Sequence, residues 1–147
     1  MNSTTELPAT MGEAILTEPW WLQAWLGILV LAIAGALLFV IGREQGKWRV
    51  RPEAIAILVS AVLASMIMDW IYANYGYVRL LGLGHLIAWT PVYLWILTHK
   101  QQFPLSTVYG KYIHFYLIIA GISLAIDATD VVRHLLGDGE LFLRWNT

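Results

Sequence analysis

The 147-residue sequence contains no cysteine and little charge. Without cysteine the chain has no disulfide framework, no thiolate nucleophile and no cysteine-ligated metal. Charged residues make up 13% of the chain and hydrophobic residues 59%, whereas an ordinary globular protein is about 25% charged and about 45–50% apolar. A water-soluble protein of this size needs more polar surface than these residues supply. The composition therefore indicates an integral membrane protein.

Neither sign of charge is in excess, because nine Lys and Arg residues stand against ten Asp and Glu residues. This balance, with the apolar composition, excludes an intrinsically disordered chain, an acidic tail and a basic surface for nucleic acid. The sequence also contains no HExxH or GxSxG motif of the kind that marks hydrolytic enzymes. We therefore expect no nucleic-acid partner, and the sequence favours a role other than catalysis.

The sequence does contain four long apolar runs. A helix needs about 20 consecutive apolar residues to cross a bilayer core of about 30 Å. The runs at residues 20–42, 54–75, 78–98 and 109–136 meet this length, and short segments connect them. Short connections favour an up-down antiparallel bundle. We therefore predict an all-α, four-helix transmembrane bundle that forms a single integral membrane domain over residues 1–147.

Charge placement predicts the orientation of the bundle. One side of the predicted membrane carries Arg43, Lys47, Arg49, Arg51, Lys100 and Lys111. The other side carries Arg79, Arg133 and Arg144 together with Glu6, Glu13, Glu18, Asp138 and Glu140. The positive-inside rule therefore places the basic loops in the cytoplasm and both termini on the outer side. Short loops without a recognisable targeting signal are typical of the bacterial plasma (inner) membrane.

A few ionisable residues lie within the predicted spans, where a charge costs about 2.5–3.5 kcal/mol at the centre and usually faces protein or water. At about 1.5 Å per residue, those on the second, third and fourth spans lie roughly 9–13 Å below the outer end, in one layer. The layer contains Asp69, His85, Asp127 and Asp130. His134, nearer the end of the fourth span, shares one helix face with Asp127 and Asp130 by the spacing i, i+3, i+7. The candidate site residues are Asp69, His85, Asp127, Asp130 and His134.

The carboxylates of this layer outnumber the basic side chains close enough to neutralise them, so they require a proton, a cation or a basic group of a partner. A cation held by Asp and His would have oxygen and nitrogen ligands, which suit Zn²⁺, Mn²⁺, Fe²⁺ or Cu²⁺. Carboxylates and histidines in series along one helix face also fit a pathway for protons or ions. The same side chains can instead join helices or subunits by hydrogen bonds alone.

Two functional classes follow from these alternatives. In the first, the chain is a small polytopic protein of the lipid bilayer that works as a homo-oligomer or as a subunit of a larger membrane complex. In the second, it binds or transports a divalent metal ion or protons through the Asp/His cluster, and a membrane metalloenzyme is a less favoured form of this class. His114 lies in the inner half of the fourth span, too far from His85 for the two to share a haem. A single axial histidine to a haem or pigment stays an open alternative for either residue.

Overall fold

The computed structural model describes residues 8–76 and 78–138, and this part of the chain is mostly helical. Four of its helical segments are long and apolar enough to cross a membrane, which confirms the prediction of a helical protein with four candidate spans. The long helices are α2 (Trp20–Phe39), α3 (Pro52–Tyr75), α4 (Gly82–Thr98), which follows the short η1 (Arg79–Leu81), and α5 (Val108–Leu135). Of the charges used to predict the orientation, Glu6, Glu140 and Arg144 lie outside the described residues.

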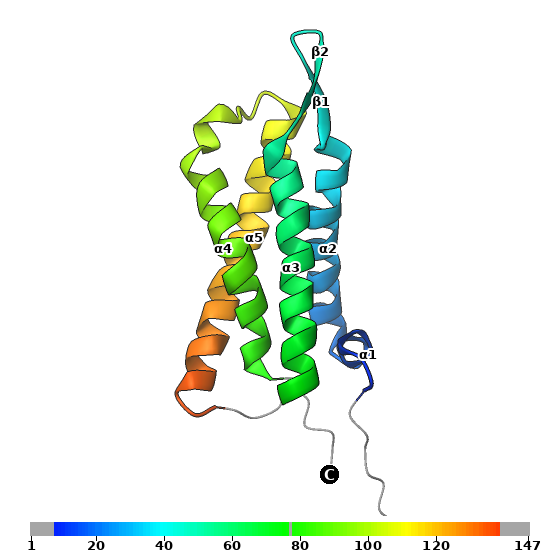
Figure 1. Ribbon diagram of the computed structural model, residues 1–147, viewed down its shortest axis with the longest axis vertical. Coiled ribbons are helices and arrows are strands. Elements are labelled where there is room, and N and C mark those ends of the chain that lie inside the picture. Colours follow the sequence, from blue (N-terminus) through cyan, green and yellow to red (C-terminus); the bar gives the residue numbers. More distant parts are fainter. Residues whose placement is uncertain (1–7, 77, 139–147) are drawn as a thin grey trace, which may run out of the picture.

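The four long helices lie side by side, and short elements mark the two ends of the bundle (Figure 1). One end carries the strands β1 (Ile41–Glu44) and β2 (Lys47–Val50) and the short η2 (Lys100–Gln102). The other end carries α1 (Met11–Leu16) and η1. We call these the hairpin end and the α1 end.

A β-hairpin connects α2 to α3, where the sequence analysis expected only a short connecting segment. α2 ends at Phe39, and β1 pairs with β2 in antiparallel register from Ile41 opposite Val50 to Glu44 opposite Lys47. The two residues of the turn, Gln45 and Gly46, have φ angles of 50° and 80°. Positive φ at both central positions is the geometry of the tight turns that join two-residue hairpins. Glycine at the second position is a sequence signal for such a turn, because glycine adopts positive φ without steric cost.

The short helix α1 was also missed, although the sequence contains its start signal. Oγ1 of Thr10 accepts a hydrogen bond from the backbone N–H of Glu13, and the Glu13 carboxylate accepts one from the backbone N–H of Ala9. The Thr10 contact satisfies an N–H group that the first helical turn leaves free, and the Glu13 contact binds the residue that precedes the N-cap. Gln23, the polar residue of the first predicted span, then donates to the carbonyls of Glu18 and Leu16 and fastens α1 to α2.

Small residues allow the long helices to approach one another. A Cβ atom at Gly84 of α4 would lie 2.9 Å from the Ala64 carbonyl oxygen of α3, and one at Gly82 would lie 2.9 Å from Cβ of Asp127 on α5. The buried core of the bundle contains Ala36, Ala54, Ile57, Ile96, Ile113 and Tyr116. Large apolar side chains on the outside of the same helices are exposed, as expected for surfaces that face lipid.

Candidate functional site

The first turn of α4 brings His85 into contact with Asp127 of α5. Nδ1 of His85 lies 2.8 Å from Oδ2 of Asp127, and the two side chains are only 14% and 17% exposed. Gly82, one helical turn before His85, leaves the space that this close approach of α4 and α5 requires. The imidazole also stacks on the Trp89 ring, with 4.1 Å between ring centroids. Helix packing and ring stacking therefore hold the His85–Asp127 pair in a defined geometry.

The hydrogen bond fixes the chemistry that the His85–Asp127 pair offers. With Nδ1 donating to the carboxylate, Nε2 of His85 remains as the free ring nitrogen. Nε2 accepts a hydrogen bond when the imidazole is neutral and donates one when the ring is protonated. The pair can therefore bind a proton or hydrogen-bond a polar group of a ligand.

A second pair, between Arg79 and Asp130, lies closer to the α1 end. Asp130 is therefore not one of the carboxylates that lack a basic partner. Nη1 of Arg79 lies 2.7 Å from Oδ1 of Asp130, with the side chains 20% and 21% exposed. Nε of Arg79 also lies 3.2 Å from Oδ2 of Asp138, which Arg133 contacts at 2.9 Å. Asp130 is therefore neutralised across the interface between η1 and α5.

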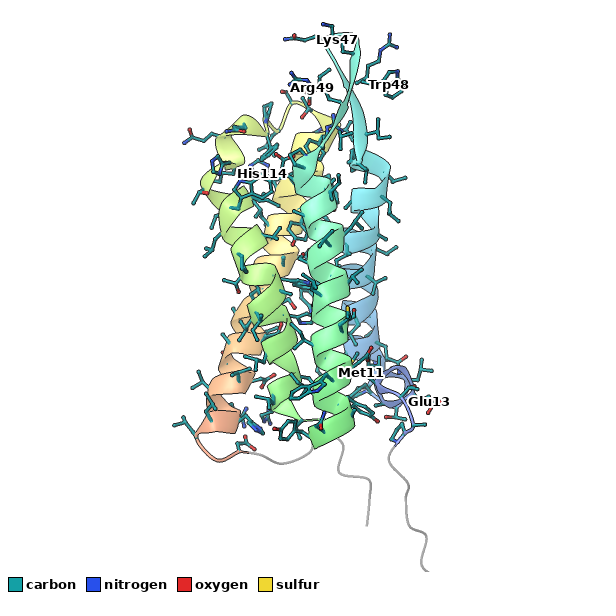
Figure 2. The ribbon with its side chains drawn as sticks, in the orientation of Figure 1. Met11, Glu13, Lys47, Trp48, Arg49 and His114 are labelled. Carbon is teal, nitrogen blue, oxygen red and sulfur yellow. The ribbon has the colours of Figure 1, made fainter. Side chains whose placement is uncertain are left out.

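Both pairs line a cavity of about 740 Å³ at the α1 end. Glu18 and Ser123 add further polar groups, while the remaining lining is mostly apolar. Helix α1 contributes Met11, which lies at this end of the bundle (Figure 2). The apolar lining of α2 and α5 includes Trp21, Trp25, Leu26, Leu29, Ile122 and Ile126. The cavity thus combines apolar walls with a few convergent charged groups, the usual make-up of a small-molecule site.

Part of the cavity lining lies at the surface of the bundle. Two lining side chains, Trp21 of α2 and Ile126 of α5, are 59% and 50% exposed. Both belong to helices that qualify as membrane spans. The exposed part of the cavity lining therefore lies on two candidate spans.

Two of the predicted site residues do not line this cavity. Asp69 is exposed on α3, directly after the cavity-lining Met68, and within the described part of the chain it makes no hydrogen bond or ion pair. His134 is half-buried on α5, and its Nδ1 atom is buried without a hydrogen-bond partner among the residues described. The structure therefore joins His85 to Asp127 and Asp130 to Arg79, but it brings neither Asp69 nor His134 into either pair.

Sequence reasoning did not find the part of the cavity that α1 and α2 provide. Trp21 and Trp25 of α2 both line the cavity, although neither was among the candidate site residues. The signal that could have indicated this is the i, i+4, i+8 spacing of Trp21, Trp25 and Leu29, which places them on one helix face. α2 is apolar on nearly all sides, so this face did not stand out.

A metal centre formed by several protein ligands does not occur in the described structure. Over residues 8–76 and 78–138, no group of three or more His, Asp and Glu side chains is arranged to hold a metal ion. His85 and Asp127 are the one pair of predicted ligands that lie in contact. A metal at this point would need its other ligands from water or from a second molecule.

Comparison with known proteins adds no family to this description. No family model, curated protein or solved structure matches the chain. The four apolar helices are compatible with a small multi-pass membrane protein. Any more specific function has to be argued from the geometry of the described residues.

Proposed function

We propose that this protein binds an amphipathic molecule that enters from the membrane, in the cavity at the α1 end. The observation that carries the proposal is the combination of apolar walls with the His85–Asp127 and Arg79–Asp130 pairs in one cavity. Its volume of about 740 Å³ falls within the range of about 300–1,000 Å³ for small-molecule sites. The polar group of the ligand would hydrogen-bond to Nε2 of His85, and its apolar part would lie between α2 and α5.

The orientation that goes with this proposal is an up-down bundle in a bacterial plasma membrane, with both termini outside and the hairpin in the cytoplasm. The hairpin end carries most of the basic side chains, whereas the described part of the α1 end carries two arginines, Arg79 and Arg133, among several acids. This asymmetry is the basis of the positive-inside rule. The cavity then opens to the outer leaflet.

The orientation can be tested with single cysteines, because the chain has none of its own. Gln45 lies in the hairpin turn and Gly12 in the exposed part of α1. In intact cells a membrane-impermeant maleimide should label Gly12→Cys but not Gln45→Cys, and both should react after permeabilisation. The reverse pattern would overturn the proposed orientation.

Ligand binding can be tested by extracting the molecules that co-purify with the protein in mild detergent. Ile126→Trp enlarges an exposed side chain of the cavity lining, whereas Ile118→Trp makes the same change at a position of α5 that is also exposed but does not line the cavity. Mass spectrometry of organic extracts should find a lipophilic compound with the wild type and Ile118→Trp, and several-fold less with Ile126→Trp. Equal amounts in all three proteins, or no such compound in the wild type, would refute the proposal.

Proton and metal binding are narrower forms of the same proposal. The His85–Asp127 pair supplies a proton-binding group at the cavity. A divalent ion such as Zn²⁺, Mn²⁺, Fe²⁺ or Cu²⁺ would find only this pair, which favours proton exchange with the ligand over metal binding. Elemental analysis of the purified protein decides between them, because one metal ion per chain that is lost in Asp127→Asn would establish the metal.

A second candidate function, favoured by Asp69, is assembly into a homo-oligomer or a larger membrane complex. The Asp69 carboxylate is exposed on a membrane-spanning helix and has no partner among the described residues. A charge that faces lipid within a span is unfavourable, by about 2.5–3.5 kcal/mol at the bilayer centre and less toward its surface, and a donor on a neighbouring chain would remove this cost. Assembly through α3 and ligand binding at the α1 end are compatible, since they use different surfaces.

A further inference from the structure

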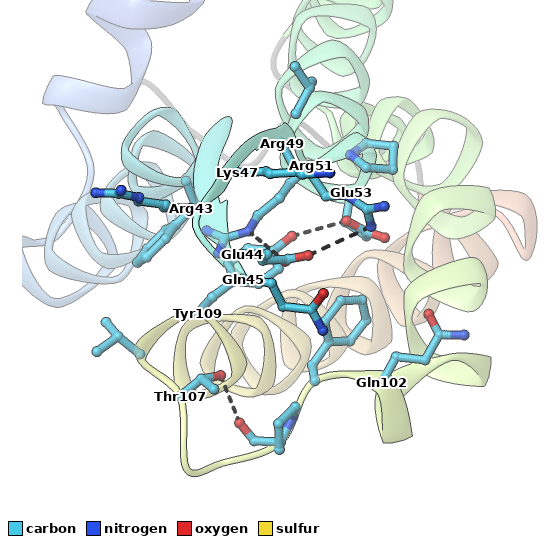
Figure 3. A pocket seen from close by; sticks show the side chains of 16 residues that line it. Arg43, Glu44, Gln45, Lys47, Arg49, Arg51, Glu53, Gln102, Thr107 and Tyr109 are labelled. Atoms are coloured by element: carbon cyan, nitrogen blue, oxygen red, sulfur yellow. Dashed lines mark hydrogen bonds and ion pairs between the residues drawn. The ribbon is translucent and has the colours of Figure 1, made fainter.

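The hairpin end contains a second cavity, at the opposite end of the bundle from the His85–Asp127 pair. It measures about 930 Å³ and lies between the hairpin, the first turn of α3 and the segment that leads into α5 (Figure 3). Its charged lining consists of Arg43, Lys47, Arg49 and Arg51 together with Glu44 and Glu53. Four basic side chains thus face two acidic ones, which leaves the cavity with a positive charge.

The two carboxylates are already engaged inside the cavity. Glu44 lies 3.7 Å from Arg51 and 3.9 Å from Arg49. Glu53 accepts a hydrogen bond from the Tyr109 hydroxyl at 3.2 Å. Arg43 and Lys47 form no ion pair with any residue that the structure describes. The uncompensated charge is therefore positive and suits an anion.

Arg51 is held in place before any ligand binds. Its guanidinium carbon lies 4.1 Å from the centre of the Tyr109 ring, an arrangement that is favourable for a cation. The guanidinium occupies the space left by Gly42, where a Cβ atom would collide with it. Nε of Arg51 is nevertheless buried without a hydrogen-bond partner within the described structure. The Glu44 carboxylate lies 3.7 Å from this Nε, too far for a hydrogen bond, so the fixed guanidinium can still donate to a phosphate oxygen.

The other face of the hairpin is mostly apolar and indicates where the anion comes from. In the register of the two strands, Ile41, Trp48 and Val50 share one face with Arg43, and Glu44, Lys47 and Arg49 lie on the opposite face. These three apolar side chains are 57%, 73% and 60% exposed, and Figure 2 shows Trp48 and Arg49 on opposite sides of the ribbon.

Large apolar side chains are also exposed on the helix ends that adjoin the hairpin, including Leu38 of α2 and Ile55 of α3. Tryptophan next to basic residues at the end of a span is typical of the membrane interface, where the lipid headgroups lie. A phospholipid bound here would extend its acyl chains along α2 and α3 and place its phosphate among the basic side chains.

We infer that the cavity at the hairpin end is a binding site for the phosphate headgroup of an anionic membrane lipid. Arg51 supplies the fixed donor, and Lys47 and Arg49 supply the charge that distinguishes an anionic headgroup from a zwitterionic one. The inference is independent of the ligand proposed for the α1 end, since the two cavities share no lining residue.

The test compares two variants that lose the same charge at the same end of the molecule. Lys47→Gln/Arg49→Gln removes two cations from the cavity lining. Lys100→Gln/Lys111→Gln removes two exposed cations that do not line it. The wild type and both variants are placed in nanodiscs of mixed phosphatidylglycerol and phosphatidylcholine. After release into detergent, native mass spectrometry counts the lipids that each protein retains.

We expect the wild type to retain phosphatidylglycerol preferentially, the cavity variant to lose this preference on the order of tenfold, and the control variant to keep it. Equal loss in the two variants would show a general charge effect and overturn the inference. Saturable binding of inorganic phosphate or glycerol 3-phosphate to lipid-free protein, abolished by Lys47→Gln/Arg49→Gln, would make a soluble phosphate compound the ligand and also overturn it. Identical melting temperatures of the three proteins exclude misfolding as the cause.

Discussion

Nδ1 of His85 contacts Oδ2 of Asp127 at 2.8 Å and joins the first turn of α4 to α5 across 42 positions of sequence. Because the pair is largely buried and lines the cavity at the α1 end, it contributes to helix packing and also presents a polar group to a ligand. The two roles can be separated by measurement. A packing role changes the stability of the protein without ligand, whereas a binding role changes the affinity for the ligand.

The packing role predicts an interaction energy between the two side chains. In a double-mutant cycle with His85→Ala and Asp127→Ala, we expect a coupling of about 1 kcal/mol in the free energy of unfolding, because hydrogen bonds between membrane helices have modest net strength. Circular dichroism monitors unfolding in mixed micelles of mild detergent and SDS. It gives the free energy of unfolding of the wild type, the two single variants and the double variant. Additive single effects would show that the contact does not stabilise the bundle.

The two arginines of the α1 end should differ in their contributions to stability. Arg79 forms a pair with Asp130 in which both side chains are about one-fifth exposed, whereas the Arg133 side chain is 54% exposed in its pair with Asp138. We expect Arg79→Gln to destabilise the protein by about 2 kcal/mol, because it leaves Asp130 poorly solvated, and Arg133→Gln by about 0.5 kcal/mol or less. Thermal unfolding in detergent measures both, and equal effects would contradict this assignment.

Two glycines should respond to alanine in opposite ways. A Cβ atom at Gly110, in the first turn of α5, would collide with the Pro104 carbonyl, while one at Gly27 of α2 meets nothing within 4 Å. Gly110→Ala should therefore destabilise the protein by about 1–3 kcal/mol. Gly27→Ala should be neutral or stabilising by up to about 1 kcal/mol, since alanine is the better helix former. Unfolding in detergent measures both, and a stable Gly110→Ala would show that the turn before α5 can shift.

Asp69 tests the assembly candidate. Its carboxylate has no partner in the described part of the chain, so Asp69→Leu should not lower the stability of a monomer. If α3 meets another chain through this carboxylate, the variant should lose the assembled state in size-exclusion chromatography with light scattering. Thr129→Leu, which replaces an exposed polar residue of α5, should leave assembly intact. A monomeric wild type, or an Asp69→Leu variant that still assembles, would exclude assembly through Asp69.

The candidate site was predicted from the sequence in part. Depth below the membrane surface, which follows from counting residues along a helix, selected His85 and Asp127 among its candidates, and these two residues meet. Asp69 lies at the same depth, but it is exposed on α3 and does not line the cavity. Depth alone could not distinguish it from the residues that do. Depth is fixed by sequence position, but the direction of a side chain depends on how each helix is rotated in the bundle.

The sequence by itself determined the four spans, because length and apolar character set whether a helix can cross a bilayer. It also contained the local signals for the hairpin turn and the start of α1, since these depend on neighbouring residues. Only the tertiary structure decided that Arg79 pairs with Asp130, that Trp21 and Trp25 line a cavity, and that Arg51 lies over Tyr109. Spans that are apolar on nearly every side do not indicate which face meets a neighbour, so these contacts were fixed by packing at particular glycines and by charge pairing between distant residues.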